Sequence, residues 1–194
     1  FKQKTAYEIS LGLVGSEMCI RDSFIREVSD SGCNVFIVHA RKAWLRGLSP
    51  KENRNIPPLN YERVYKLKDE FPDLEIIING GIENIEDSKT HLRYVDGVMM
   101  GRKAYKNPYQ LIKVDHLFYE LPFLPKTRKD ILLEMIPYII QQHNAGIKIH
   151  LICRHFMGLT KGTRFAKNIR SSLMNLNTLK EPEKKLIQIA NQLN

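Results

Sequence analysis

The chain has 194 residues, of which 43% are hydrophobic and 26% are charged, a balance typical of a globular protein with a buried core. No uninterrupted apolar stretch approaches the ~18 to 20 residues that a membrane-spanning helix needs, which excludes an integral membrane protein. We expect no membrane partner, although basic charge alone does not separate nucleic acid from a membrane surface. Thirty basic side chains against 21 acidic ones give a net charge of +9, which favours an anionic partner.

Residues 1–23 resemble translated sequencing-adapter sequence, which contains the strings TAYEI and LVGSEMCIRDS. We therefore expect this segment to be artefactual and the natural sequence to begin near Phe24. A secretory signal is the alternative interpretation, but its apolar part, Ile9 to Val14, is short and interrupted, and no cleavage site of small residues follows it.

Short apolar runs alternate with helical patterns from Phe24 to about Glu120, which predicts an α/β fold of βαβ units with a parallel sheet. The strand segments are apolar on both faces, which predicts that both faces are covered. Three strands are too few for a closed barrel, so we expect the C-terminal portion of a TIM (β/α)8 barrel. The predicted strands cover 35–38, 74–78 and 95–100, and the predicted helices cover 24–31, 61–67 with Asn60 as cap, 84–92 and the residues from Arg102 onward.

The pattern changes near Glu120, where Leu121 to Pro125 predicts a linker. Strand signals then disappear and apolar residues recur at helical spacing, which predicts a small all-helical domain. We therefore divide the chain into a partial barrel over 24–118 and a helical domain over 119–194. The helices expected in that domain cover 131–140, 147–157, 164–173 and 182–193.

Glycines follow two neighbouring predicted strands. The second strand runs into Asn79, Gly80 and Gly81, and the third runs into Gly101 and Arg102. Glycine lets backbone N–H groups approach a ligand closely, and the Arg102 guanidinium can bind phosphate oxygens. These two glycine segments match the phosphate site that (β/α)8 barrels form after their last two strands. The alternative is that the glycines only allow tight turns.

Two further segments carry candidate binding residues. His39 follows the first predicted strand, where parallel-sheet enzymes place ligand-contacting side chains, although a lone histidine is more often structural. The loop from Lys42 to Arg54 carries four basic side chains, one acid and Trp44, which suits a polyanion with stackable bases. A solvated loop with Trp44 packed against the core is the alternative.

Basic residues without acidic ones characterise the helical tail. Between Met135 and Leu179 the sequence contains no Asp or Glu, while Arg164, Lys167 and Arg170 recur on roughly one helix face. We interpret this region as a footprint for RNA or DNA phosphates rather than as a mixed solubilising surface.

The three cysteines, Cys19, Cys33 and Cys153, are too few for a disulfide scaffold and suit a reducing compartment, which we expect to be the cytoplasm or an organellar matrix. Cys153 lies near His150 and His155, but the three do not share a helix face, so we predict no metal site.

Three stretches identify a family. They are HARKAWLRGLSPKENRNIPPL from His39 to Leu59, INGGI from Ile78 to Ile82, and DGVMMGR from Asp96 to Arg102. Together they closely resemble the tRNA-dihydrouridine synthases, and the first stretch resembles their A-type branch. The resemblance covers the chain from Phe24 to about Leu173.

The resemblance implies an oxidoreductase that reduces the C5–C6 double bond of a uridine in the D loop of tRNA. It implies FMN as the cofactor, NADPH as the reductant, and a (β/α)8 barrel followed by a helical tRNA-binding domain. The residues implied to bind FMN are His39, Asn79, Gly80, Gly81, Gly101 and Arg102, and those implied to bind tRNA are Lys51, Arg54, Arg164 and Lys167.

The family's proton donor is a cysteine in an Asn-x-Gly-Cys-Pro type motif, and none of the three cysteines lies in that context. We therefore expect the donor upstream of this chain, no catalytic residue within it, and no activity from the chain by itself. Two alternatives remain: another FMN-dependent barrel oxidoreductase that acts on a small metabolite, and a non-catalytic RNA-binding module. The sequence does not predict the oligomeric state.

Overall fold

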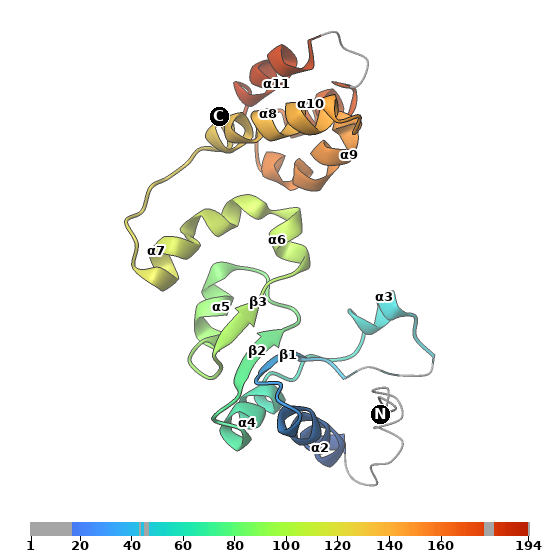
Figure 1. Ribbon diagram of the computed structural model, residues 1–194, viewed down its shortest axis with the longest axis vertical. Helices are drawn as coiled ribbons and strands as arrows, with labels where there is room; N and C mark the ends of the chain where they lie inside the picture. The colour runs from blue at the N-terminus through green and yellow to red at the C-terminus, as the bar shows by residue number, and fades with distance from the viewer. Residues whose placement is uncertain (1–16, 43, 45–46, 177–180, 194) are drawn as a thin grey trace. The chain divides into compact units, whose positions relative to one another are not determined.

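A computed structural model describes residues 17–42, 44, 47–176 and 181–193 (Figure 1). Backbone contacts divide the chain into two compact units. The sheet unit contains the residues up to Gly81 together with 90–99, and the helical unit contains 82–89 together with the residues from Met100 onward. Among the described residues, no helix is both long enough and apolar enough to cross a lipid bilayer.

The sheet unit is centred on three parallel strands in the order β1-β2-β3 (Figure 1). The register pairs His39 with Asn79 and Asn79 with Met99, so the carboxyl ends of the three strands meet at one edge. The predicted α/β class with a parallel sheet is therefore confirmed. The strands are β1 (Val35–His39), β2 (Glu75–Asn79) and β3 (Gly97–Met99).

The two faces of the sheet differ in burial. Ile76 and Ile78 of β2 are fully buried, and α4 (Glu62–Glu70) lies in contact with this strand. Alternate residues of a strand point to opposite faces, and Val35 and Ile37 of β1 are 49% and 58% exposed. The prediction that both faces are covered is wrong for β1, because about half of the surface of these two side chains stays exposed among the described residues.

The helices of the sheet unit begin close to the predicted positions, with two differences. α2 starts at Glu17 rather than at Phe24, and residues 1–16 of the segment expected to be artefactual lie outside the described residues. The second difference is α3, which no predicted helix covers. Tyr61 is the N-cap residue of α4, and Oδ1 of Asn60, one residue earlier, accepts the N–H of Arg63 at 3.0 Å. The helices are α2 (Glu17–Asp30), α3 (Pro50–Asn53), α4 (Glu62–Glu70) and the last residues of α5 (Ile85–His91).

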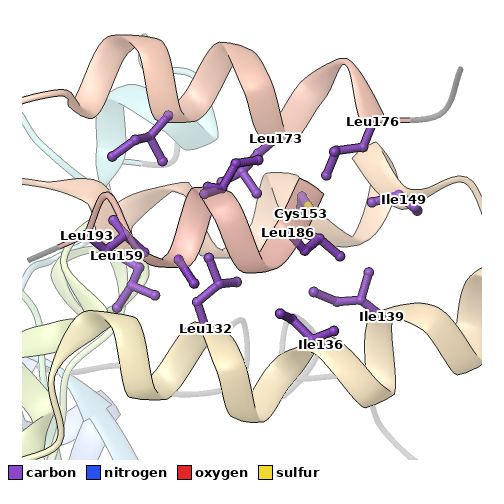
Figure 2. Close-up of a cluster of buried hydrophobic side chains, with 13 residues drawn as sticks. Leu132, Ile136, Ile139, Ile149, Cys153, Leu159, Leu173, Leu176, Leu186 and Leu193 are labelled. Atoms are coloured by element: carbon purple, nitrogen blue, oxygen red, sulfur yellow. The ribbon is translucent and has the colours of Figure 1, made fainter. Parts of the chain in front are cut away.

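The helical unit is built around one apolar core (Figure 2). Leu132, Ile136 and Ile139 of α8 face this core and are at most 4% exposed, as expected for an apolar stripe on one side of a helix. Ile169 and Leu173 of α10 are buried in the same cluster. The helices are α6 (Arg102–Lys106), η1 (Pro108–Lys113), α7 (Val114–Tyr119), α8 (Arg128–Asn144), α9 (Ile149–Cys153), η2 (Arg154–Thr160), α10 (Ala166–Met174) and α11 (Pro182–Ala190).

The continuous helix predicted over 147–157 is instead divided into α9 and the 3-10 segment η2. Phe156 has a φ of −118°, outside the helical range, and η2 packs against α6 and η1. A Cβ on Gly158 would lie only 2.7 Å from the carbonyl oxygen of Tyr105 and from Cδ of Pro108. The segment from α6 to η1 therefore packs within the helical unit, while the domain boundary at residue 118 stays a prediction.

Candidate functional site

The carboxyl edge of the sheet brings together four of the predicted site residues. His39 and Asn79 are direct partners in the parallel register, and Gly80 and Gly81 follow Asn79. The side-chain amide of Asn79 lies 3.3 Å from the sulfur of Met99, which ends β3. One polar side chain from each of β1 and β2 therefore lies at this edge, followed by the glycine turn.

Gly80 and Gly81 form a turn that larger side chains would disturb. Their φ angles are +110° and +73°, in the region that favours glycine. A Cβ on Gly80 would lie 2.9 Å from Cε1 of His39, and one on Gly81 would collide with the side chain of Leu59 and lie 2.9 Å from the hydroxyl oxygen of Tyr61. The imidazole of His39 therefore packs directly on the backbone of this turn.

The hydrogen bond of His39 determines which ring nitrogen can donate. The backbone N–H of Arg41 donates to Nδ1 of His39 at 3.2 Å. Because Nδ1 is the acceptor, the neutral imidazole carries its proton on Nε2. His39 can therefore act as a donor from Nε2 towards a polar acceptor at the edge of the sheet.

An aromatic cluster lies next to the glycine turn and forms a hydrogen bond with it. The hydroxyl of Tyr61 donates to the carbonyl oxygen of Gly80 at 3.0 Å, and its ring lies edge-on to His91, with 4.4 Å between the centroids. Nδ1 of the buried His91 lies 2.6 Å from the hydroxyl of Tyr65, whose ring stacks on Tyr94. Burial raises the pKa of Tyr65 above its ordinary value. The sequence analysis did not predict this cluster. The signal that could have indicated it is the helical spacing of Tyr61 and Tyr65, which precede the two glycines.

The other predicted phosphate-binding pair, Gly101 and Arg102, lies at the start of α6 in the helical unit. Gly101 has a φ of −95° and a ψ of −98°, and a Cβ there would meet no described atom within 4 Å beyond its chain neighbours. Nearby, Nζ of Lys103 lies 2.6 Å from the carboxylate of Glu83. This bond, with smaller contributions from Arg102 and Lys161, holds the pKa of Glu83 below its ordinary value. The charges of three cationic side chains therefore act on this carboxylate, and Lys103 contacts it directly.

Backbone and side-chain hydrogen bonds join the two ends of the loop that carries Lys51 and Arg54. Arg41 and Leu59 form an isolated antiparallel bridge, and the guanidinium of Arg41 donates to the carbonyl oxygen of Pro57. These bonds fix both ends of the loop beside the strand edge that carries His39.

A capping box orders the tip of this loop. Oγ of Ser49 accepts the N–H of Glu52, and the Glu52 carboxylate accepts the N–H of Ser49 at 2.8 Å, so α3 is capped reciprocally. The hydrogen bonds from Ser49 hold the pKa of Glu52 below its ordinary value. Glu52 keeps its negative charge, and the exposed side chains of Lys51 and Arg54 outweigh it, so the tip carries a net positive charge. The Ser-x-x-Glu spacing is the signal that could have predicted α3.

Trp44 is attached to α3 rather than to the core. Its backbone N–H donates to Oδ1 of Asn53 at 2.7 Å, and Nδ2 of Asn53 donates to the carbonyl oxygen of Trp44 at 2.9 Å. The side chain of Trp44 is 44% exposed. The structure therefore does not adopt the alternative in which Trp44 packs against the core.

Arg164 lies two residues before α10 and Lys167 lies in its first turn, and both side chains are exposed. Arg170, the third evenly spaced cation, donates from Nη1 to Oγ1 of Thr160 at 3.2 Å. Two of the three cations therefore extend into solvent, whereas the third supports the backbone that precedes the helix.

The described cysteine side chains do not lie at the predicted site. Cys153 is fully buried in the helical core, and burial raises the pKa of its thiol to about 12. Cys33 precedes β1, at the opposite end of the strand from His39, and its Sγ donates to the carbonyl oxygen of Val35. Within the described ranges, no group of three His, Cys, Asp or Glu side chains could hold a metal ion.

The predicted site residues are distributed over both units. The sheet unit holds His39, Lys51, Arg54, Asn79, Gly80 and Gly81, and the helical unit holds Gly101, Arg102, Arg164 and Lys167.

Comparison with known proteins gives a family and several relatives. A family model described as dihydrouridine synthase matches residues 8–194. The tRNA-dihydrouridine(20/20a) synthase of Shewanella oneidensis is 49% identical over 150 residues, which are 77% of this chain and 45% of the relative. The protein of the same name from Synechocystis sp. is 46% identical over 169 residues, which are 87% of this chain and 51% of the relative. The chain spans about half the length of the curated relatives it matches.

Proposed function

We propose, because this chain belongs to the dihydrouridine synthase family, that it takes part in the reduction of a D-loop uridine of tRNA to 5,6-dihydrouridine, with FMN as cofactor and NADPH as reductant. The observation that supports this proposal most directly is the family match over residues 8–194, which includes both glycine segments and the α3 loop. The relatives' activity belongs to chains about twice as long, so the reaction is proposed for the whole protein.

We further propose that the three parallel strands are part of a (β/α)8 barrel. In such a barrel one face of the sheet points to the interior, where side chains from other strands cover it. The exposed Val35 and Ile37 of β1 are apolar and stand on the face opposite the buried Ile76 and Ile78, as this proposal requires.

The glycine turn after β2 fits a cofactor with a phosphate tail. Both glycines have positive φ, a conformation in which successive backbone N–H groups can bind an anion, and Gly81 is exposed while Gly80 is buried. Asn79, Gly80 and Gly81 would hold the ribityl and phosphate groups together with Gly101 and Arg102. The open space beside Gly101 and the fixed charge of Arg102 suit a phosphate.

His39 would contact the flavin ring system. Since its Nδ1 accepts the N–H of Arg41, His39 would donate from Nε2 to an acceptor on the edge of the ring. Bound FMN would supply the hydride for the uracil ring, and the residues of this chain would position the two rings. We assign no proton donor among the described residues, because the Cys153 thiol is buried and Cys33 lies at the opposite end of β1.

The tRNA would bind the exposed cations of both units. Lys51 and Arg54 extend from a capped α3, and Arg164 and Lys167 extend from an acid-free helical region. The number of exposed cations favours a polyanion over a small metabolite, because a small substrate could contact only a few of them. A tRNA substrate also suits a cytoplasmic or organellar location.

The proposal is tested with a chimera in which the N-terminal half of the Synechocystis relative replaces residues 1–23. Incubated with FMN, NADPH and unmodified tRNA, the chimera should form dihydrouridine, which mass spectrometry of the tRNA measures.

Arg102→Ala should weaken FMN binding about tenfold because it removes a charge-assisted contact to phosphate. Arg93→Ala, which removes an exposed guanidinium from the sheet unit, is the matched control. Flavin reduction without any change in the tRNA would favour the small-metabolite alternative.

A further inference from the structure

The backbone that precedes α10 is held at several points. We call residues Thr160–Phe165 the α10 turn. Nη2 of Arg128 donates to the carbonyl oxygen of Lys161 at 3.1 Å, and Arg170 donates to Oγ1 of Thr160. Both the N–H and Oγ1 of Thr163 donate to the carbonyl oxygen of Thr160. Side chains that extend from this turn are therefore presented by an ordered backbone.

Phe165 ends the α10 turn with its ring in solvent. Its side chain is 49% exposed, whereas Ile169 and Leu173, on the apolar face of α10, are buried in the core. The carbonyl oxygen of Phe165 accepts the N–H of Ile169, so the residue is fixed to the first turn of the helix. The position of the ring is thus not explained by packing in the core cluster.

The surroundings of the ring are cationic. The guanidinium carbon of Arg164 lies 5.4 Å from the ring centroid of Phe165, and the Lys167 side chain is exposed two positions further along. The sequence contains no acidic residue between Met135 and Leu179. An exposed ring beside exposed cations combines the two features that single-stranded RNA requires of a binding surface: a stacking platform and phosphate contacts.

We propose that Phe165 is a base-stacking residue for an unpaired base of the tRNA, with Arg164 and Lys167 binding the adjacent phosphates. This inference rests on the proposed tRNA substrate and adds a stacking contact to the ionic ones. Stacking is insensitive to salt, whereas each phosphate contact adds to the salt dependence of binding. The two contributions can therefore be separated by experiment.

The test measures the Kd of the 194-residue protein for an unmodified tRNA transcript and for a short oligouridine, each at two salt concentrations. Phe165→Ala and Phe165→Leu should weaken both complexes about tenfold at either salt concentration and leave the salt dependence unchanged. Phe165→Tyr, which keeps the ring, should bind as the unaltered protein does. Arg164→Ala combined with Lys167→Ala should instead reduce the salt slope by about 0.7 for each lost phosphate contact.

Tyr138→Ala is the matched control, because Tyr138 of α8 is also 49% exposed and also lies in the acid-free region. It should change neither Kd by more than about twofold. If the unaltered protein binds tRNA and Phe165→Leu behaves as Tyr138→Ala does, the stacking role is refuted while the proposed function stands. If the unaltered protein binds neither RNA, the tRNA proposal and the stacking role both fail. Thermal unfolding of each variant shows whether a loss of affinity reflects a loss of folding.

Discussion

The hydroxyl oxygen of Tyr61 and the carbonyl oxygen of Gly80 lie 3.0 Å apart, and the hydrogen bond between them joins the start of α4 to the turn after β2. A backbone carbonyl in a turn with positive φ has few alternative partners within the chain. The ring of Tyr61 is held in turn by His91, which is buried. The conformation of the proposed phosphate cradle therefore depends on side chains that would not themselves contact a ligand.

Tyr61→Phe should loosen the glycine turn without unfolding the sheet unit. The substitution removes one hydrogen bond, with an expected loss of about 0.5 to 1.5 kcal/mol in the free energy of unfolding. Amide hydrogen exchange should become faster at Gly80 and Gly81 while β2 keeps its protection. Tyr94→Phe is the control, because Tyr94 stacks on Tyr65 through its ring. Equal exchange rates in the two variants would contradict the positioning role of Tyr61.

Gly81→Ala and Gly101→Ala should differ in their effect on stability. A Cβ at position 81 would collide with Leu59 and would sit on a backbone with φ of +73°, so we expect a loss of about 1 to 3 kcal/mol. A Cβ at position 101 would meet no described atom within 4 Å, so Gly101→Ala should lower the free energy of unfolding less than Gly81→Ala does. Urea unfolding measures both values, and similar losses would show that Gly101 is constrained by the fold. If Gly101→Ala is stable but weakens FMN binding, a ligand requires this glycine.

Ser49→Ala should weaken tRNA binding more than it weakens the fold. It removes the side-chain cap of α3, a loss of about 1 kcal/mol that is confined to an exposed four-residue helix. Lys51 and Arg54 would then extend from a disordered tip, so we expect affinity for tRNA to fall several-fold while the melting temperature changes little. Ser29→Ala, in which an exposed serine of α2 is altered, controls for the loss of a hydroxyl group. An unchanged affinity would show that α3 does not present the cations to RNA.

Periodicity in the sequence was sufficient to predict the elements whose apolar residues are buried. The strand at β2 and the helices α8 and α10 carry apolar side chains at regular spacing, and these side chains are the ones that the structure buries. Periodicity could not predict exposure on β1, because Val35 and Ile37 are apolar and the pattern does not distinguish a covered face from an uncovered one. It also missed α3, whose residues are all accessible and whose order comes from the Ser49 and Glu52 cap.

The candidate site was predictable to the extent that it depends on strand ends. His39 and Gly80 lie where the pattern placed them, because the carboxyl ends of parallel strands meet at one edge. The contacts that fix their conformations were not predictable. The bond from Tyr61 to Gly80 joins residues that only the fold brings together, and the bond from Arg41 to Nδ1 of His39, although local, depends on the conformation of the chain just after β1.

Cys153 should resist alkylation in the folded protein. Its thiol is fully buried and has a pKa raised to about 12, so almost no thiolate is present near neutral pH. Peptide mass spectrometry after brief treatment with iodoacetamide should find Cys33 modified and Cys153 unmodified. In urea both should react, which controls for peptide detection. Modification of Cys153 at the same rate as Cys33 under native conditions would show that the helical core opens readily.

Asp96 should stabilise the sheet unit above about pH 4 and lose this effect in acid. Its carboxylate accepts the N–H of Ile76 at 2.8 Å and lies 2.9 Å from Nζ of Lys68. Burial alone would raise the pKa of Asp96, but these hydrogen bonds outweigh it and hold the pKa below its ordinary value. Because the folded state binds the proton less tightly, the stabilisation is complete above the ordinary pKa of about 3.9 and declines as the pH falls towards the folded value.

Asp96→Asn should therefore lower the free energy of unfolding by about 1 kcal/mol at neutral pH, a small effect because the side chain is 35% exposed and solvent screens the ion pair. The difference between the two proteins should shrink as the pH falls below about 4, since the carboxyl group of the unaltered protein is then increasingly protonated. Urea unfolding at a series of pH values measures this difference in the free energy of unfolding. Asp69→Asn, on the exposed side of α4, is the control. A difference that stays constant with pH would mean that Asp96 contributes through its shape and hydrogen bonds, and that its charge contributes nothing.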